Sequence, residues 1–127
     1  MKKKSSTRTA KPVVYTYAKC STCRDAVRWL HARDIDFVEM PINETPPSPD
    51  ELQRMLVHQD GNLRRLFNTS GIEYRTRGLA TKLATMPVSS AFHLLSTHGM
   101  LVKRPFVLGS SFGLVGFDEG AWAKAFG

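Results

Sequence analysis

The feature that most constrains the fold is a pair of cysteines at the point where a strand-like run becomes a helical pattern. Residues 13–17 read Val-Val-Tyr-Thr-Tyr, a β-branched and aromatic run that is typical of a buried strand. From Cys23 to Leu30 the apolar residues recur at the spacing of one helix face, which predicts a helix that ends near Arg33. Strand, tight turn and helix therefore follow one another directly, and Cys20 and Cys23 straddle the first turn of the helix.

The first half of the chain predicts a β-α-β unit followed by helices. Residues 35–40 form a plausible second strand, and the intervening helix would place it parallel to the first. Ser48-Pro49-Asp50-Glu51 supplies a helix cap, a proline at the first helical position and a glutamate three residues after the cap. We expect that helix to run to about residue 58, where Asp60-Gly61 stops it, and a short helix to follow at 63–67.

The second half predicts a helix and a hairpin. A helix over 88–98 begins after Pro87 and is closed by Gly99. Residues 101–108 and 112–117 are two strand-like runs joined by Gly-Ser-Ser, which is a hairpin signal. Asp118 can cap a last helix through Ala125. The predicted fold class is therefore α/β, in the order β-α-β, several helices, then β-β-α.

The length and charge favour one globular domain with a basic extension. The 127 residues carry a net charge of +7, but residues 1–12 hold five of the 18 basic residues and no acid, which leaves 13 basic against 11 acidic residues. We therefore expect a disordered, solubilising tail over 1–12 and a domain over 13–127, with nucleic-acid contact by the tail as the minor alternative. No signal peptide or apolar stretch of membrane-spanning length is visible, so we expect a cytoplasmic protein.

The setting of the two cysteines favours redox chemistry. Unpaired backbone N–H groups and the positive end of the helix dipole would lie close to Cys20, and Lys19 and Arg24 flank it. These features favour a thiolate, so we expect Cys20 to be the attacking thiol and the deeper Cys23 to be the resolving one. Two alternatives stay open: half of a metal site, for which the four histidines offer no second ligand pair at zinc-like spacing, and a pair of inert buried thiols.

A second candidate group interrupts the run at 101–108. Lys103-Arg104-Pro105 stands inside it, and proline cannot donate to a sheet ladder. The two cations are either a solvated edge or, if this strand lies beside the first one, a source of charge near Cys20. In the second case Arg104 could hold an oxyanion through bidentate hydrogen bonds.

Several stretches together resemble one family. They are the tyrosine-ending strand followed by CxxCR, "LFNTSG" at 66–71, "YRTRGL" at 74–79, "GMLVKRPFVLG" at 99–109 and "GLVGF" at 113–117. This combination is similar to the glutaredoxin-related arsenate reductase family, which includes the Spx-type transcriptional regulators. The resemblance covers residues 13–126. It implies a thioredoxin-like fold, with a mixed four-stranded sheet flanked by helices and a helical insertion between its halves.

The resemblance also assigns roles to residues. It implies Cys20 as nucleophile, a cis proline at Pro105 facing the cysteine loop, and Arg104 as the oxyanion-binding arginine, while Cys23 matches the second cysteine of the Spx-type members. The residues that we assign to substrate binding are Lys19, Ser21, Thr22, Arg24 and Pro105. Two further arginines of the arsenate reductases are not matched: Asn68, Thr69 and Ser70 stand where one is expected, and Leu114 to Phe117 supply none in the last strand. Nearby arginines that could partly compensate are Arg64, Arg65, Arg75 and Arg77.

These inferences predict a thiol-disulfide oxidoreductase that acts on an oxyanion such as arsenate or on a disulfide. Glutathione or thioredoxin would be the external reductant, and we expect no bound metal or organic cofactor. The alternative is a Spx-like regulator that binds RNA polymerase and uses the cysteine pair as a redox switch. We expect neither membrane insertion nor nucleic-acid binding by the globular part.

Overall fold

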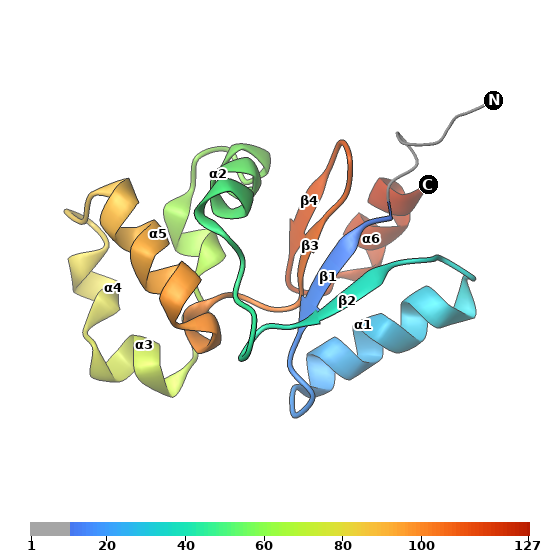
Figure 1. The fold of residues 1–127 in the computed structure, drawn as a ribbon, viewed down its shortest axis with the longest axis horizontal. Helices are drawn as coiled ribbons and strands as arrows, with labels where there is room; N and C mark the ends of the chain where they lie inside the picture. Colours follow the sequence, from blue (N-terminus) through green and yellow to red (C-terminus); the bar gives the residue numbers. More distant parts are fainter. Residues whose placement is uncertain (1–10) are drawn as a thin grey trace.

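The computed structural model describes residues 11–127, and over these residues it confirms the predicted order of elements (Figure 1). The strands are β1 (Val13–Thr16), β2 (Val38–Pro41), β3 (Phe106–Leu108) and β4 (Gly113–Val115). The helices are α1 (Ser21–Ala32), α2 (Pro49–His58), α3 (Ile72–Thr76), α4 (Leu79–Lys82), α5 (Val88–Thr97) and α6 (Glu119–Phe126), with 3₁₀ turns η2 (Leu63–Leu66) and η3 (Gly99–Leu101).

The tail predicted over residues 1–12 lies mostly outside the described residues. Only Lys11 and Pro12 of this segment are described, and the carbonyl of Pro12 accepts a hydrogen bond of 2.9 Å from the Val38 N–H. This bond extends the pairing of β1 with β2 by one residue. The disordered tail therefore stays a prediction for residues 1–10.

The four strands form one mixed sheet in the order β2-β1-β3-β4. β2 runs parallel to β1, as predicted, whereas β3 runs antiparallel to β1 and pairs with β4 in a hairpin. The second strand begins at Val38 and not at residue 35, because Asp34 takes a left-handed φ of 55° and the Ile35 N–H still bonds to the Leu30 carbonyl of α1. This topology puts β1, which leads into the cysteine loop, next to β3.

The alternation of side chains along the central strands divides the interior into two cores. Val14 and Val107 face the side covered by α1 and α6, where they join a buried aromatic cluster around Trp29 and Trp122. Tyr15 and Phe106 face the opposite side and pack edge to face, with ring centroids 5.8 Å apart. That side is covered by the helical insertion α2–α5 (Figure 1).

Part of the helical insertion was predictable and part was not. The start of α2 is a complete capping box in which the Glu51 N–H donates to the Ser48 Oγ at 3.1 Å and the Ser48 N–H donates to the Glu51 carboxylate at 2.9 Å. In contrast, α3 and α4 have five and four residues, and no side chain caps either start. Helices this short have little local signal, and packing of Tyr74 and Leu79 into the core stabilises them.

The prediction of a strand from residue 101 is wrong. Strand β3 is confined to Phe106–Leu108, while Gly99–Leu101 form a 3₁₀ turn. The Lys103 N–H bonds to the Leu66 carbonyl instead of a strand of the sheet, and the peptide bond between Arg104 and Pro105 is cis, as the resemblance implied. The segment before β3 is thereby tied to η2.

Asp118 occupies the predicted cap position of α6, but its side chain forms no capping hydrogen bond. No helix among residues 11–127 is both long enough and apolar enough to cross a membrane.

Candidate active site

Cys20 stands at the N-cap of α1, directly after β1 and a tight turn. Its backbone N–H bonds to the Tyr17 carbonyl at 3.0 Å, which closes the turn. Its sulfur accepts a hydrogen bond of 3.3 Å from the backbone N–H of Cys23. The Cys20 side chain thus takes the place that a serine or aspartate oxygen has in an ordinary helix cap, where an anion is favoured by the free N–H groups and the helix dipole.

The residues around Cys20 hold this loop in place. The Arg24 guanidinium lies in the first turn of α1 and donates a hydrogen bond of 3.0 Å back to the Ala18 carbonyl. Arg24 therefore stabilises the turn. Among residues 11–127 it forms no hydrogen bond to the Cys20 sulfur. Cys23 lies one turn deeper and is only 2% exposed.

Arg104 reaches the same region from the segment before β3. One of its terminal nitrogens donates to the Met100 carbonyl at 3.2 Å, and its guanidinium carbon lies 5.3 Å from the centre of the Tyr17 ring. Its Nε is buried and has no hydrogen-bond partner among residues 11–127. A buried N–H without a partner is costly, so this atom is well suited to an anionic group supplied by a ligand.

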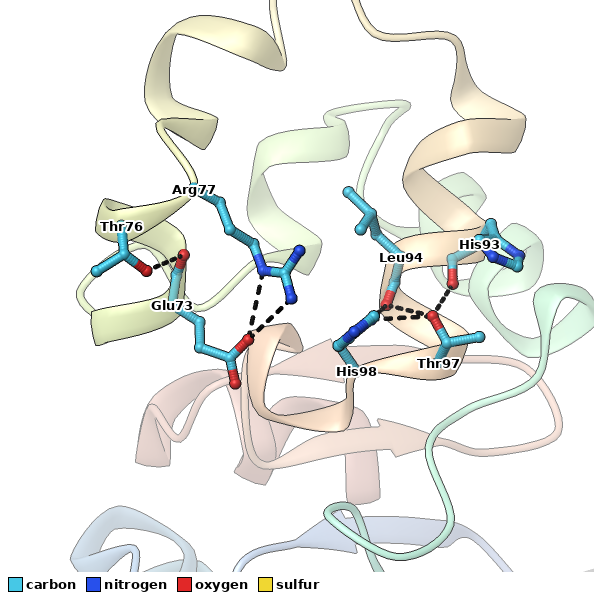
Figure 2. Close-up of polar contacts among 7 residues, drawn as sticks. All are labelled: Glu73, Thr76, Arg77, His93, Leu94, Thr97 and His98. Carbon is cyan, nitrogen blue, oxygen red and sulfur yellow. Dashed lines mark hydrogen bonds and ion pairs between the residues drawn. The ribbon is translucent and has the colours of Figure 1, made fainter.

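The Met100 carbonyl, which accepts the hydrogen bond from Arg104, belongs to η3, and η3 lies close to the backbone of Ile42. Gly99 opens η3, and a side chain there would collide with the carbonyl of Ile42. Figure 2 shows the preceding turn, where the Thr97 hydroxyl donates to the His93 carbonyl at 2.6 Å at the end of α5. Glycine at this position therefore allows η3 to lie against the loop after β2.

The two thiols have opposite electrostatic environments. Burial opposes ionisation of Cys20, but the hydrogen bonds it accepts from Cys23 and the charge of Arg104 outweigh burial, so the pKa of Cys20 is lowered. Burial is the main cause that raises the pKa of Cys23 to about 12, and the nearby Cys20 thiolate adds to it. Both cysteines are free thiols. Cys20 is therefore the thiol of the pair that loses its proton first, beside a Cys23 that stays protonated.

Cys20 opens into a pocket of about 620 Å³, which we call the nucleophile pocket. Its lining residues come from the start of α1, the insertion, the segment from η3 to β3 and the residues after β4: Cys20, Thr22, Asn68, Ser70, Gly71, Ile72, Glu73, Met100, Lys103, Arg104, Gly116 and Phe117. Two cations, Lys103 and Arg104, and one acid, Glu73, are thus present. The Glu73 carboxylate is 3.4 Å from the Arg77 guanidinium, and both side chains are more than a third exposed (Figure 2).

The structure brings only some of the predicted residues together. Cys20, Thr22 and Arg104 line the nucleophile pocket. Ser21 is exposed in the first turn of α1, and Pro105 is buried beside Arg104. Lys19 and Arg24 line other cavities, both of which also include Tyr17 and Glu39. The assignment of these residues to substrate binding stays a prediction.

Sequence reasoning missed the wall of the pocket that the insertion supplies. Ile72 and Glu73 belong to α3, a helix too short to predict, and Asn68, Ser70 and Gly71 were noted only as parts of the family resemblance. Of the four arginines considered as compensation, none lines the nucleophile pocket: Arg64 and Arg65 line a neighbouring pocket, Arg77 pairs with Glu73, and Arg75 donates to the Ser70 carbonyl. A three-arginine oxyanion pocket is not formed by the described residues.

Comparison with known proteins identifies the family. Residues 15–125 match the ArsC family. The chain belongs to the ArsC family. The uncharacterized protein YusI of Bacillus subtilis (strain 168) is 40% identical over 105 residues, which are 83% of this chain and 89% of YusI. The global transcriptional regulator Spx of the same organism is 28% identical over 106 residues, 84% of this chain and 79% of Spx.

A solved structure confirms the fold. The crystal structure of a "possible arsenate reductase" from Streptococcus mutans UA159 superimposes with a TM-score of 0.84 at 33% identity, covering 93% of this chain and 100% of that one. The resemblance inferred from the sequence and the thioredoxin-like fold class are thus confirmed.

Among residues 11–127 no three His, Cys, Asp or Glu side chains gather as metal ligands would.

Proposed function

We propose that this ArsC family protein is a thiol-disulfide oxidoreductase with Cys20 as the nucleophile and Cys23 as the resolving thiol. The observation that carries the proposal is the position of Cys20: its sulfur caps α1, accepts the Cys23 N–H at 3.3 Å and lines the nucleophile pocket together with Arg104. This environment lowers the pKa of Cys20, while burial raises that of Cys23. Perturbed thiols at a helix start are typical of redox-active sites. Inert buried thiols would not explain a half-buried Cys20 whose sulfur accepts the Cys23 N–H and lies beside an arginine.

The proposed cycle has two exchange steps. The Cys20 thiolate attacks one sulfur of a disulfide, which forms a mixed disulfide at Cys20 and expels the other sulfur as a thiolate. Cys23 then loses its proton to solvent and attacks the Cys20 sulfur, which releases the second substrate thiolate and leaves a Cys20–Cys23 disulfide. An external dithiol, or two molecules of a monothiol such as glutathione, reduces this disulfide and restores both thiols.

Arg104 would stabilise negative charge near the reacting sulfur. Its unpaired Nε and its position beside Cys20 suit a thiolate leaving group or an oxyanion. Arsenate remains a candidate substrate of the same site, but Glu73 places a carboxylate on the pocket wall, and the pocket has only two cations. A multiply charged oxyanion is therefore less well matched than a disulfide, and we propose disulfides as the principal substrates.

The proposal is tested by following oxidation of a coupled reductant by the purified protein. Glutathione and thioredoxin are supplied in separate reactions, and either a neutral small disulfide or arsenate serves as oxidant. We expect turnover with the disulfide, and loss of most of it in Arg104→Ala. Arsenate turnover that exceeds disulfide turnover would contradict the substrate assignment, and absence of both would contradict the enzymatic function.

A second candidate function rests on the similarity to Spx and on the intact cysteine pair. If the chain is a redox-switched regulator, oxidation of Cys20 and Cys23 should change its binding to RNA polymerase. Pull-down of polymerase by the oxidised and the reduced protein distinguishes this function, since an enzyme of small disulfides should show no redox-dependent capture.

A further inference from the structure

A second, smaller pocket of about 250 Å³ adjoins the nucleophile pocket, and the two share Lys103. We call it the basic pocket. Its lining residues are Asn62, Arg64, Arg65, Phe67, Thr69, Lys103 and Val115, among which there are three cations and no acid. The function proposed above does not use it.

The two arginines of this pocket are held in place by neutral groups. The Arg65 Nε donates to the Gln59 side-chain oxygen at 2.8 Å, and Gln59 is itself buried and donates to the Gly113 carbonyl at 3.2 Å. Arg64 donates to the hydroxyl of buried Tyr74 at 2.7 Å and to the Ala80 carbonyl at 3.3 Å. Both guanidinium groups are thus anchored while their charge is left without a carboxylate partner.

The three cations of the basic pocket have no carboxylate partner among the described residues. Over residues 11–127 there are two ion pairs, Arg28 with Asp25 and Arg77 with Glu73, and neither includes a cation of the basic pocket. Arg64, Arg65 and Lys103 line one pocket, so their like charges repel one another, and a bound anion relieves that repulsion. Fixed guanidinium groups also match the planar geometry of a carboxylate and lose little freedom on binding it.

We infer that the basic pocket binds a carboxylate of the disulfide substrate while the disulfide itself lies against Cys20. This inference rests on the proposed function and deepens it, since it defines the substrate class as disulfides that carry an acidic group, such as peptide-like disulfides. Lys103 belongs to both pockets and would contact the substrate between its sulfur and its carboxylate.

The test compares two disulfides of equal length that differ only in charge: dithiodibutyrate, which carries two carboxylates, and its uncharged diamide. The rate constant for loss of the Cys20 thiol is measured for each with the full-length reduced protein at low salt. We expect the dicarboxylate to react at least about threefold faster, the modest gain that partly exposed ion pairs give. Added salt should reduce this preference without any mutation.

Variants of Arg65 test whether this residue causes the faster reaction of the dicarboxylate disulfide. Arg65→Gln should slow the dicarboxylate reaction and bring the ratio of the two rate constants close to one, whereas Arg65→Lys, which keeps the charge, should retain most of the ratio. Lys82→Gln is the matched control, because Lys82 is an exposed cation of α4 and lines neither pocket. Should Arg65→Gln not fold, the salt dependence of the unmodified protein and Arg65→Lys decide the question.

The outcomes distinguish failure of the carboxylate site from failure of the proposed function. A ratio near one in the unmodified protein, or an equal loss in Arg65→Gln and Lys82→Gln, overturns the carboxylate site while the diamide reaction at Cys20 still supports the proposed function. Failure of Cys20 to react with either disulfide overturns both.

Discussion

The Cys20 sulfur lies between two sides of the site that are built in different ways. On one side the first turn of α1 presents the backbone N–H of Cys23, 3.3 Å from the sulfur. On the other side stands the Arg104 guanidinium, held by a hydrogen bond of 3.2 Å to the Met100 carbonyl and by the face of the Tyr17 ring. The backbone of α1 therefore stabilises negative charge on the sulfur from one side, and the side chain of Arg104 does so from the other.

This difference determines what a mutation can remove. The helix N-terminus exists in any variant that keeps α1, because its free N–H groups belong to the main chain. The position of Arg104 depends on contacts outside α1: the Met100 carbonyl in η3 and the Tyr17 ring in the cysteine turn, which is distant in sequence. Substitutions on the Arg104 side should therefore change the reactivity of Cys20 by degrees, while only loss of the sulfur itself should abolish reaction.

The largest effect is expected for Cys20→Ser. A hydroxyl stays protonated at neutral pH even at a helix start, so neither side of the site can make it a nucleophile toward disulfides. We expect turnover to fall to the uncatalysed background in the coupled assay, with the fold retained by circular dichroism. Turnover above background in a folded Cys20→Ser protein would mean that Cys23 or another group attacks the substrate.

The next effect is expected for Cys23→Ser, which keeps the backbone N–H and removes the resolving thiol. The first exchange step should proceed, and the mixed disulfide at Cys20 should accumulate as one adduct per chain in mass spectrometry. With thioredoxin as reductant, turnover should fall by about tenfold or more. The reason is that Cys23, held next to Cys20, attacks the mixed disulfide at an effective concentration that a free thiol does not reach. Unchanged turnover would show that an external thiol resolves the adduct.

A graded effect is expected for Arg104→Ala. Loss of the charge should raise the pKa of Cys20 and so lower its thiolate fraction at neutral pH. Removal of a neighbouring opposite charge typically changes such an ionisation equilibrium by about tenfold. The rate of disulfide attack should therefore fall by about that factor at neutral pH. Arg104→Lys, which keeps a charge but not the planar guanidinium, should lose less.

The pH dependence of the reaction rate tests whether Arg104 acts through the pKa of Cys20. Because the thiolate is the reactive form, the rate should be constant above the pKa of Cys20 and should decrease as the pH falls through it. In Arg104→Ala the whole curve should move to higher pH. A curve that stays in place while the maximum rate falls would mean that Arg104 contacts the substrate and does not act on the thiol.

The smallest effect is expected for Tyr17→Leu. The Tyr17 ring lies near the Arg104 guanidinium, both residues are half-buried, and a cation–π contact of this kind contributes about 0.5–1 kcal/mol. Losing it should loosen Arg104 and lower the rate by about twofold, while the Tyr17 carbonyl still accepts from the Cys20 N–H. An effect as large as that of Arg104→Ala would show that the ring, and not the Met100 carbonyl, positions the arginine.

The same contrast explains what the sequence could predict. The β1-turn-α1 unit, the capping box of α2 and the hairpin signal are local patterns, and the structure confirms these elements. The region before β3 was misassigned because its hydrogen bonds run to η2 and not to the sheet, which no local pattern encodes. Glu73 was missed for a related reason, since α3 forms only when packing supports it.

The most direct measurement is the rate of alkylation of Cys20 by iodoacetamide as a function of pH, with the modified residue identified by peptide mapping. The pKa of Cys23, about 12, keeps that thiol unreactive over the useful range. The account predicts a midpoint for Cys20 clearly below that of a free cysteine, about 8.5, and a higher midpoint in Arg104→Ala. A midpoint at or above that of a free cysteine in the unmodified protein would contradict it.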